Sequence, residues 1–350
     1  MSVEEYVRAM PKIELNLRLE GAVRKETWLM IAEQNEISVR SDYLDDWATL
    51  FASADSKRLD EIVNDLCQWI RQPDDLTRIV YDAGVNLARD NIRYAEVWVD
   101  PALFMLPTMS FEEFMTAISD GRDRAERGWG IQMRIILAAS RDEPRRADEI
   151  ARWVLSGIGQ NHGVVALGLS ERHNAQPVGQ FERAFQTVLK KGLPRVAQVA
   201  NSMQGEEEIL DVINRLEPSR LVDGWGTADA LDILKLLSDR DIPLVVSMCR
   251  ALCSEWVSNY RDYPLRALYS QGISLVISSD MPVFYNSSLV KEYLAAIEHN
   301  GFSIEEIEEF AINAVKYSFL PEKDKDEFLE NFKNEYSQLR QEYLTTFSEI

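Results

Sequence analysis

Eight short runs of apolar and β-branched residues alternate with helix-like stretches, and this alternation limits the fold more than any other feature of the sequence. The intervening stretches have apolar residues at i, i+3 and i+4, as over positions 59–70 and 76–87. Eight strands separated by helices predict a single (β/α)8 TIM-type barrel with additional helices. The predicted strands are Lys12–Leu17, Ile92–Trp98, Gln132–Ala138, Val164–Leu169, Arg195–Val199, Ser219–Val222, Ile242–Ser247 and Ile273–Ser278.

No linker rich in Pro, Gly or Ser and no repeat of 20–50 residues interrupts this order, so we expect one domain over residues 1–350. The spacings Ser110-x-x-Glu113 and Ser303-x-x-Glu306 are typical of capping boxes that begin helices. A last helix is predicted over about 321–345 from aromatic and apolar residues at helical spacing. We favour a closing helix packed on the barrel over an oligomer interface for it.

The net charge of −20 argues against nucleic-acid partners and acidic membranes, which require basic patches. The sequence has no apolar run of 18 residues, and its N-terminus is acidic, so we expect a cytoplasmic protein without a membrane partner. Its three cysteines are too few for a disulfide framework.

The first predicted strand places polar side chains at every second position: Glu14, Asn16 and Arg18, followed by Glu20. Strand geometry puts them on one face. Barrel strands are normally apolar on both faces, and functional groups of such barrels lie at the carboxyl ends of the strands. We therefore expect this polar set to face a wet pocket at the barrel mouth.

Four segments together resemble the adenosine deaminase family, part of the metal-dependent amidohydrolase superfamily. The segment Met10–Gly21 reads MPKIELNLRLEG and resembles the family's first strand, E-L-H-x-H-L-D/E-G. The segments Arg93–Val97, Arg220–Gly224 and Asp280–Pro282 resemble its R-Y-A-E-V, R-I-G-H-G and D-D-P motifs. The resemblance covers most of the chain and implies a barrel whose relatives use zinc to deaminate purine nucleosides.

The chain departs from these motifs at the positions that carry the chemistry. The family's three zinc histidines fall on Asn16, Arg18 and Val199, and only its aspartate remains, as Asp280. By the same resemblance, the proton-shuttling glutamate becomes Ser202 and the histidine that orients water becomes Asp223. The aspartate that contacts the base becomes Met281, and the loop that approaches the base contains Glu171.

Hydrolytic deamination requires a Lewis acid that activates water and a carboxylate that moves protons. Arginine has no lone pair to give a metal, valine offers no ligand atom, and one aspartate cannot hold zinc alone. From the sequence we therefore expect no metal and no cofactor. No residue is assigned as catalytic, and the expected vestigial pocket consists of Asn16, Arg18, Glu20, Glu171, Ser202, Asp223, Asp280 and Met281.

The sequence leaves three functions open. The favoured prediction is a catalytically degenerate barrel, a pseudoenzyme that binds a small molecule, purine-nucleoside-like or otherwise, or a protein partner such as a second copy or an active paralogue. The first alternative is an enzyme with metal-independent chemistry in the same pocket. The second is a purine nucleoside (adenosine) deaminase with substitute ligands.

Some of these residues also have purely structural interpretations. Asp280 could cap the helix that follows it, and Gly21 could serve a positive φ angle. A further hypothesis gives Arg18 the electrostatic place of the metal, with its guanidinium paired to both Asp223 and Asp280.

Overall fold

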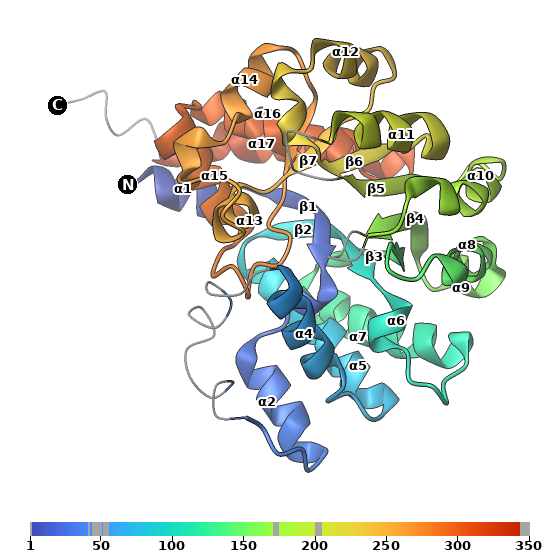
Figure 1. The fold of residues 1–350 in the computed structure, drawn as a ribbon. Helices are drawn as coiled ribbons and strands as arrows, with labels where there is room; N and C mark the ends of the chain where they lie inside the picture. The colour runs from blue at the N-terminus through green and yellow to red at the C-terminus, as the bar shows by residue number, and fades with distance from the viewer. Residues whose placement is uncertain are drawn as a thin grey trace.

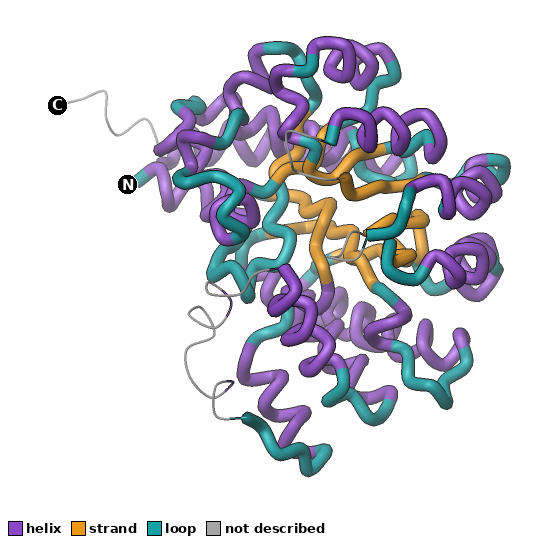
Figure 2. The backbone as a smooth tube through the Cα atoms, viewed as in Figure 1, coloured by secondary structure: helices purple, strands orange, loops and turns teal. Residues whose placement is uncertain are grey.

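A computed structural model of the chain describes residues 2–40, 43, 51, 56–170, 175–199 and 205–343. Eight parallel strands lie at the centre and helices surround them, which confirms the predicted (β/α)8 barrel (Figures 1 and 2). The strands neighbour one another in chain order. They are β1 (Lys12–Arg18), β2 (Ile92–Val99), β3 (Gln132–Ser140), β4 (Val164–Ser170), β5 (Arg195–Val199), β6 (Arg220–Asp223), β7 (Leu244–Val246) and β8 (Leu275–Ile277).

Helices follow the strands and cover the barrel. They are α1 (Val3–Ala9), α2 (Lys25–Gln34), α4 (Ser56–Cys67), α5 (Pro73–Arg89), α6 (Pro101–Phe104), α7 (Phe111–Trp129), α8 (Ala147–Leu155), α9 (Gly157–Asn161), α10 (Glu182–Leu189), α11 (Glu206–Leu216), α12 (Leu231–Asp239), α13 (Met248–Cys253), α14 (Leu265–Ser270), α15 (Leu289–Asn300), α16 (Ile304–Lys316) and α17 (Glu322–Tyr343). Both predicted capping boxes are present, at the start of α7 and of α16. In the part of the chain that the structure describes, no helix combines the length and apolar character needed to span a bilayer.

The last two strands are shorter than the sequence predicted. The apolar runs 242–247 and 273–278 contain ladders of three residues each, Leu244–Val246 and Leu275–Ile277. Ser247 leaves the strand because its hydroxyl accepts a hydrogen bond from Arg250 N–H and begins α13.

The barrel closes between β8 and β1 through individual contacts. Arg18 N–H donates to the Asp280 carbonyl at 2.9 Å, and the Ser278 hydroxyl donates to the Asn16 carbonyl at 3.1 Å. The buried Glu14 carboxylate accepts from the N–H and hydroxyl of Ser279 at 2.8 and 2.7 Å. Backbone groups of β1 and the Glu14 side chain thereby hold the segment that follows β8 against the first strand.

The helix α17 packs along α16 and α1, so that the first and the last helix of the described chain lie together (Figure 1). Phe332 and Tyr336 are buried, and the Tyr336 hydroxyl donates to the Pro11 carbonyl at 2.8 Å. An aromatic face of the last helix therefore rests on the segment that leads into β1.

Candidate functional site

Five side chains from five strand ends form a closed polar ring at the barrel mouth. Arg250 Nη1 lies 3.0 Å from Asp223 Oδ2 and 3.1 Å from Asp280 Oδ2. Gln198 Nε2 donates to Asp223 Oδ2 at 3.1 Å, and Arg18 Nη2 donates to Gln198 Oε1 at 2.5 Å. Arg18 Nε lies 3.4 Å from Asp280 Oδ1 and completes the ring. Two guanidinium groups and two carboxylates thus balance each other's charge.

The strands bring these residues together because their carboxyl ends meet at one edge of the barrel. Arg18 ends β1, Gln198 is the penultimate residue of β5 and Asp223 ends β6. Arg250 lies in α13 directly after β7, and Asp280 follows β8. In the pairing of β5 with β6, Val199 lies opposite Asp223. Gln198, one residue earlier in β5, is therefore next to the aspartate.

Arg250 is held in place by the way α13 begins. The carboxylate of Glu292, from α15, accepts hydrogen bonds from the N–H groups of Met248 and Cys249 at 2.9 and 3.0 Å. The Ser247 hydroxyl also donates to it at 2.7 Å. Burial raises the pKa of Glu292 to about 7, although these hydrogen bonds act in the opposite direction.

Arg18 takes a different position from the one hypothesised. Its guanidinium reaches Asp280 but contacts Asp223 only through Gln198, and its Nη1 also lies 3.4 Å from Glu20. The residue that bridges both carboxylates is Arg250. The bridge falls to Arg250 because α13 brings its guanidinium between the two carboxylates, whereas Arg18 approaches from β1.

Asp223 and Asp280 both have positive φ angles, 67° and 56°. This left-handed conformation is uncommon for residues with a side chain and is frequent at functional sites. Asp280 does not cap a helix, because the next helix, α15, has Ser288 as its N-cap. Strained backbone at both carboxylates favours a binding or catalytic role over a structural one.

The other predicted site residues lie around the ring. Asn16 Nδ2 is 3.5 Å from Asp280 Oδ1, and Glu20 is buried in the 3-10 helix η1 (Leu19–Gly21). Met281 packs on Gly21, where an added Cβ would lie 2.2 Å from the Met281 Cβ. Gly21 is therefore required for this close approach, and it has no positive φ, contrary to the sequence-based interpretation. Glu171 and Ser202 lie outside the described residues.

The ring is buried, whereas the sequence predicted a wet pocket. Asp280 is fully buried and Asp223 is 1% exposed, while the side chains of Arg18 and Arg250 are each 12% exposed. Burial together with the charge of Asp280 raises the pKa of Tyr285 well above its usual value. The arginines are thus the ring members nearest to solvent.

Sequence reasoning missed Gln198 and Arg250. Gln198 is the amide in the buried strand RVAQV, and Arg250 follows the apolar run of β7 by four residues. Their signal is a polar residue at the carboxyl end of a barrel strand, the position where functional groups are expected.

The residues of this site that the structure describes do not fit zinc. Across the described part of the chain, no group of three or more His, Cys, Asp or Glu side chains is arranged to hold a metal ion. At the mouth, Asp223 and Asp280 already face two guanidinium groups, so a dication between them would be repelled. What the arrangement offers is paired carboxylates, amides and guanidinium groups.

The sequence matches the family model described as adenosine deaminase over residues 11–335. A putative adenosine/adenine deaminase of Streptomyces virginiae is 27% identical over 317 residues, covering 89% of this chain and 93% of that protein. An amidohydrolase structure from Burkholderia ambifaria with bound Zn has a TM-score of 0.86 at 21% identity and covers 97% of this chain and 95% of that one. An Arabidopsis structure complexed with IMP has a TM-score of 0.82 at 20% identity, with 95% and 99% covered.

These comparisons correct two expectations. The prediction of a catalytically degenerate barrel is wrong, since the relatives that match almost the whole chain are named deaminases. The expectation of no metal cofactor is corrected as well, since the Burkholderia ambifaria amidohydrolase of the same fold was solved with bound Zn. The expected resemblance is confirmed: this chain belongs to the adenosine deaminase family.

Proposed function

We propose that this protein is a deaminase that removes the exocyclic amine of a purine at the barrel mouth. The observation that carries the proposal is the family match over residues 11–335, together with relatives named adenosine/adenine deaminase. A purine nucleoside, base or nucleotide is the expected substrate class, and the IMP bound in the Arabidopsis structure supports a purine ligand.

The donor set proposed here differs from the family pattern. Asn16, Arg18 and Val199 stand where the family has its three zinc-binding histidines. The proposed reaction therefore uses only side chains of this chain. Asp280 is the residue that this chain has in common with the family's zinc ligands. Its carboxylate lies within 3.5 Å of Asn16 Nδ2, Arg18 Nε and Arg250 Nη1.

Hydrolytic deamination adds the oxygen of water to the ring carbon that carries the amine, and the carbon–nitrogen bond then breaks to release ammonia. A carboxylate, Asp223 or Asp280, accepts the proton of the attacking water and returns it to the departing amine. The guanidinium groups of Arg18 and Arg250 stabilise negative charge that develops on the adduct. The amides of Asn16 and Gln198 offer a donor and an acceptor to the ring nitrogens.

Substrate access requires the ring to open on the side of the arginines, because both carboxylates are buried. A purine that reaches Asp280 displaces at least one guanidinium from its carboxylate partner. We therefore assign Arg18 and Arg250 to substrate binding as well as to charge balance.

The test is a deamination assay on the purified protein with adenosine, adenine, AMP and N6-methyl-AMP, which follows the release of ammonia, or of methylamine from N6-methyl-AMP. It is run as purified, after chelation, and with added Zn²⁺, alongside the metal content by mass spectrometry. We expect turnover of at least one of these purines and its loss in Asp280→Asn, while Asp232→Asn on the exposed part of α12 retains it. Absence of turnover under all three metal conditions would overturn the proposal.

A further inference from the structure

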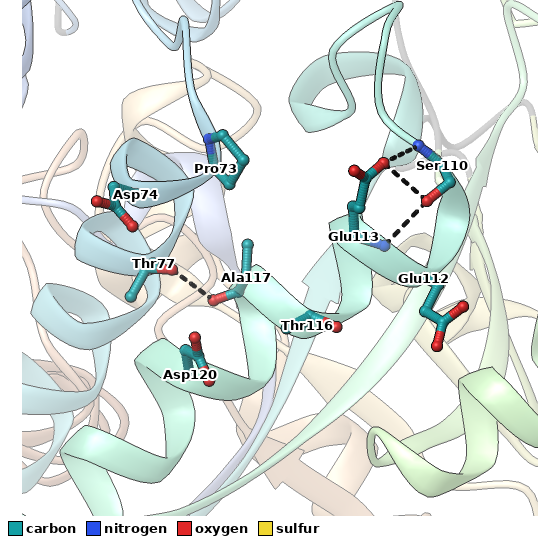
Figure 3. Close-up of a pocket in the computed structure, with 9 residues that line it drawn as sticks. All are labelled: Pro73, Asp74, Thr77, Ser110, Glu112, Glu113, Thr116, Ala117 and Asp120. Atoms are coloured by element: carbon teal, nitrogen blue, oxygen red, sulfur yellow. Dashed lines mark hydrogen bonds between the residues drawn. The ribbon is translucent and has the colours of Figure 1, made fainter.

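The outer surface of the helix pair α5 and α7 carries a groove with two hollows of opposite charge. Gly121 of α7 lets the helices approach, since an added Cβ would lie 2.4 Å from the Thr77 carbonyl oxygen. The Thr77 hydroxyl donates to the Ala117 carbonyl at 2.9 Å and fixes the pair (Figure 3). The hollows measure about 430 and 510 Å³ and follow one another along the helices.

The first hollow is acidic and the second is basic. Carboxylates of Asp74, Glu112, Glu113 and Asp120 line the first hollow, which Figure 3 draws. Guanidinium groups of Arg78, Arg124 and Arg127 line the second.

Glu113 accepts hydrogen bonds from Ser110 and Arg78 donates to Gln34, whereas other charges of the two hollows have no ion-pair partner within the described part of the molecule. Of the residues that the structure describes, Asp74, Asp120, Arg124 and Arg127 each take part in no ion pair. Asp120 and Arg124 are even one helical turn apart, a spacing at which an exposed pair commonly forms. Both signs of charge therefore remain available to another molecule.

Two exposed aromatic side chains border the basic hollow. Tyr81 lines it and is 37% exposed, and Trp129 is 47% exposed. Trp129 Nε1 donates a hydrogen bond to the Tyr81 hydroxyl at 3.4 Å. Arginine together with tyrosine and tryptophan is the composition enriched in protein–protein interfaces.

We infer that the α5–α7 face is a homodimer interface, in which the acidic hollow of one copy docks on the basic hollow of the other. A second copy carries both charges in this order, so a twofold axis between the hollows forms both contacts at once. The charge of −20 makes two copies repel each other elsewhere, whereas at this face opposite charges meet. An isologous contact of this kind requires the bipolar pattern that the groove shows.

The test is sedimentation velocity of the full chain at low and high ionic strength. We expect a dimer in about 20 mM NaCl that dissociates in about 0.5 M NaCl, because the contact is electrostatic and exposed. The double variant R124E/R127E has two acidic hollows and should be monomeric. The triple variant D74K/E112K/D120K leaves Glu113 as the one carboxylate of the first hollow, so that both hollows are basic, and it should be monomeric as well.

The decisive experiment mixes the two variants. Each is complementary to the other, so the mixture should form a heterodimer at low salt. The control K190E/K191E, at exposed positions directly after α10 and outside the α5–α7 face, changes the net charge as much as R124E/R127E does and should still dimerise. Melting curves check that each variant is folded. A wild-type monomer at about 100 µM in low salt, a dimeric R124E/R127E or a mixture that stays monomeric would overturn the inference.

Discussion

Arg250 contributes most to the charge balance of the site, since one nitrogen lies within 3.1 Å of two buried carboxylates. Its removal leaves Asp223 and Asp280 with less positive charge in a buried environment. We predict that Arg250→Ala lowers the free energy of unfolding by about 3–5 kcal/mol, the usual effect of breaking a buried ion pair.

Urea denaturation of the wild type and the variant measures this. Arg183→Ala is the matched control, because the Arg183 side chain is 85% exposed, and it should change stability by less than about 0.5 kcal/mol. Equal stabilities of Arg250→Ala and Arg183→Ala would show that the contacts of Arg250 with the two aspartates do not stabilise the fold.

Arg18 makes longer and more distributed contacts than Arg250. It reaches Asp280 at 3.4 Å, donates to Gln198, and lies 5.9 Å from the centre of the Trp98 ring. We therefore predict a smaller loss for Arg18→Ala, about 1–3 kcal/mol.

Because the two arginines share Asp280, each single variant keeps one guanidinium beside that carboxylate and the double variant keeps none, so the double variant should lose more stability than the sum of the single ones. A double-mutant cycle measures this coupling. Strict additivity would mean that the ring does not act as one unit.

At the scale of elements, α13 connects the site to a buried carboxylate on α15. Burial raises the pKa of Glu292 from 4.5 to about 7, so the folded state favours its protonated form. Protonated Glu292 therefore stabilises the folded state fully below pH 4.5. This stabilisation, up to about 3 kcal/mol, is lost as pH rises through 7.

We predict that this pH dependence disappears in Glu292→Gln. Relative to the wild type, the variant should be more stable at pH 8 than at pH 5, as measured by urea denaturation. Glu330→Gln, at an exposed position of α17, should follow the wild-type profile. If the stability of Glu292→Gln changed with pH in the same way as that of the wild type, Glu292 would not be the source of this pH dependence.

The strands and capped helices were predictable because their signals are local. Apolar runs located all eight strands to within a few residues, and the Ser–Glu spacings located the starts of α7 and α16. The ring was only partly predictable. Asn16, Arg18, Asp223 and Asp280 were found, but which arginine bridges the aspartates depends on side-chain reach across the barrel, and no spacing along the chain encodes that distance.

Across the whole molecule, α17 fastens the end of the chain to its beginning. Phe332 is 2% exposed in a helix that contacts α16 and α1. We predict that Phe332→Ala lowers the free energy of unfolding by about 3–5 kcal/mol, since it leaves a cavity. Thermal and urea unfolding measure the effect, and Lys333→Ala, at the exposed neighbouring position, is the control. A Phe332→Ala variant as stable as Lys333→Ala would mean that α17 rests only loosely on the barrel.

The seam between β8 and β1 also dictates when the site can form during synthesis. Contacts at this seam and across the barrel mouth join residues far apart in the chain: Asn16 and Asp280 are separated by 264 positions, and Arg18 and Gln198 by 180. Loops of this length close late, because their entropy must be lost before the contact gains anything. The first strand therefore leaves the ribosome long before its last neighbour exists. The polar side chains of this strand therefore lack their partners until almost the entire chain has been made, as is the case for Glu14, Asn16 and Arg18.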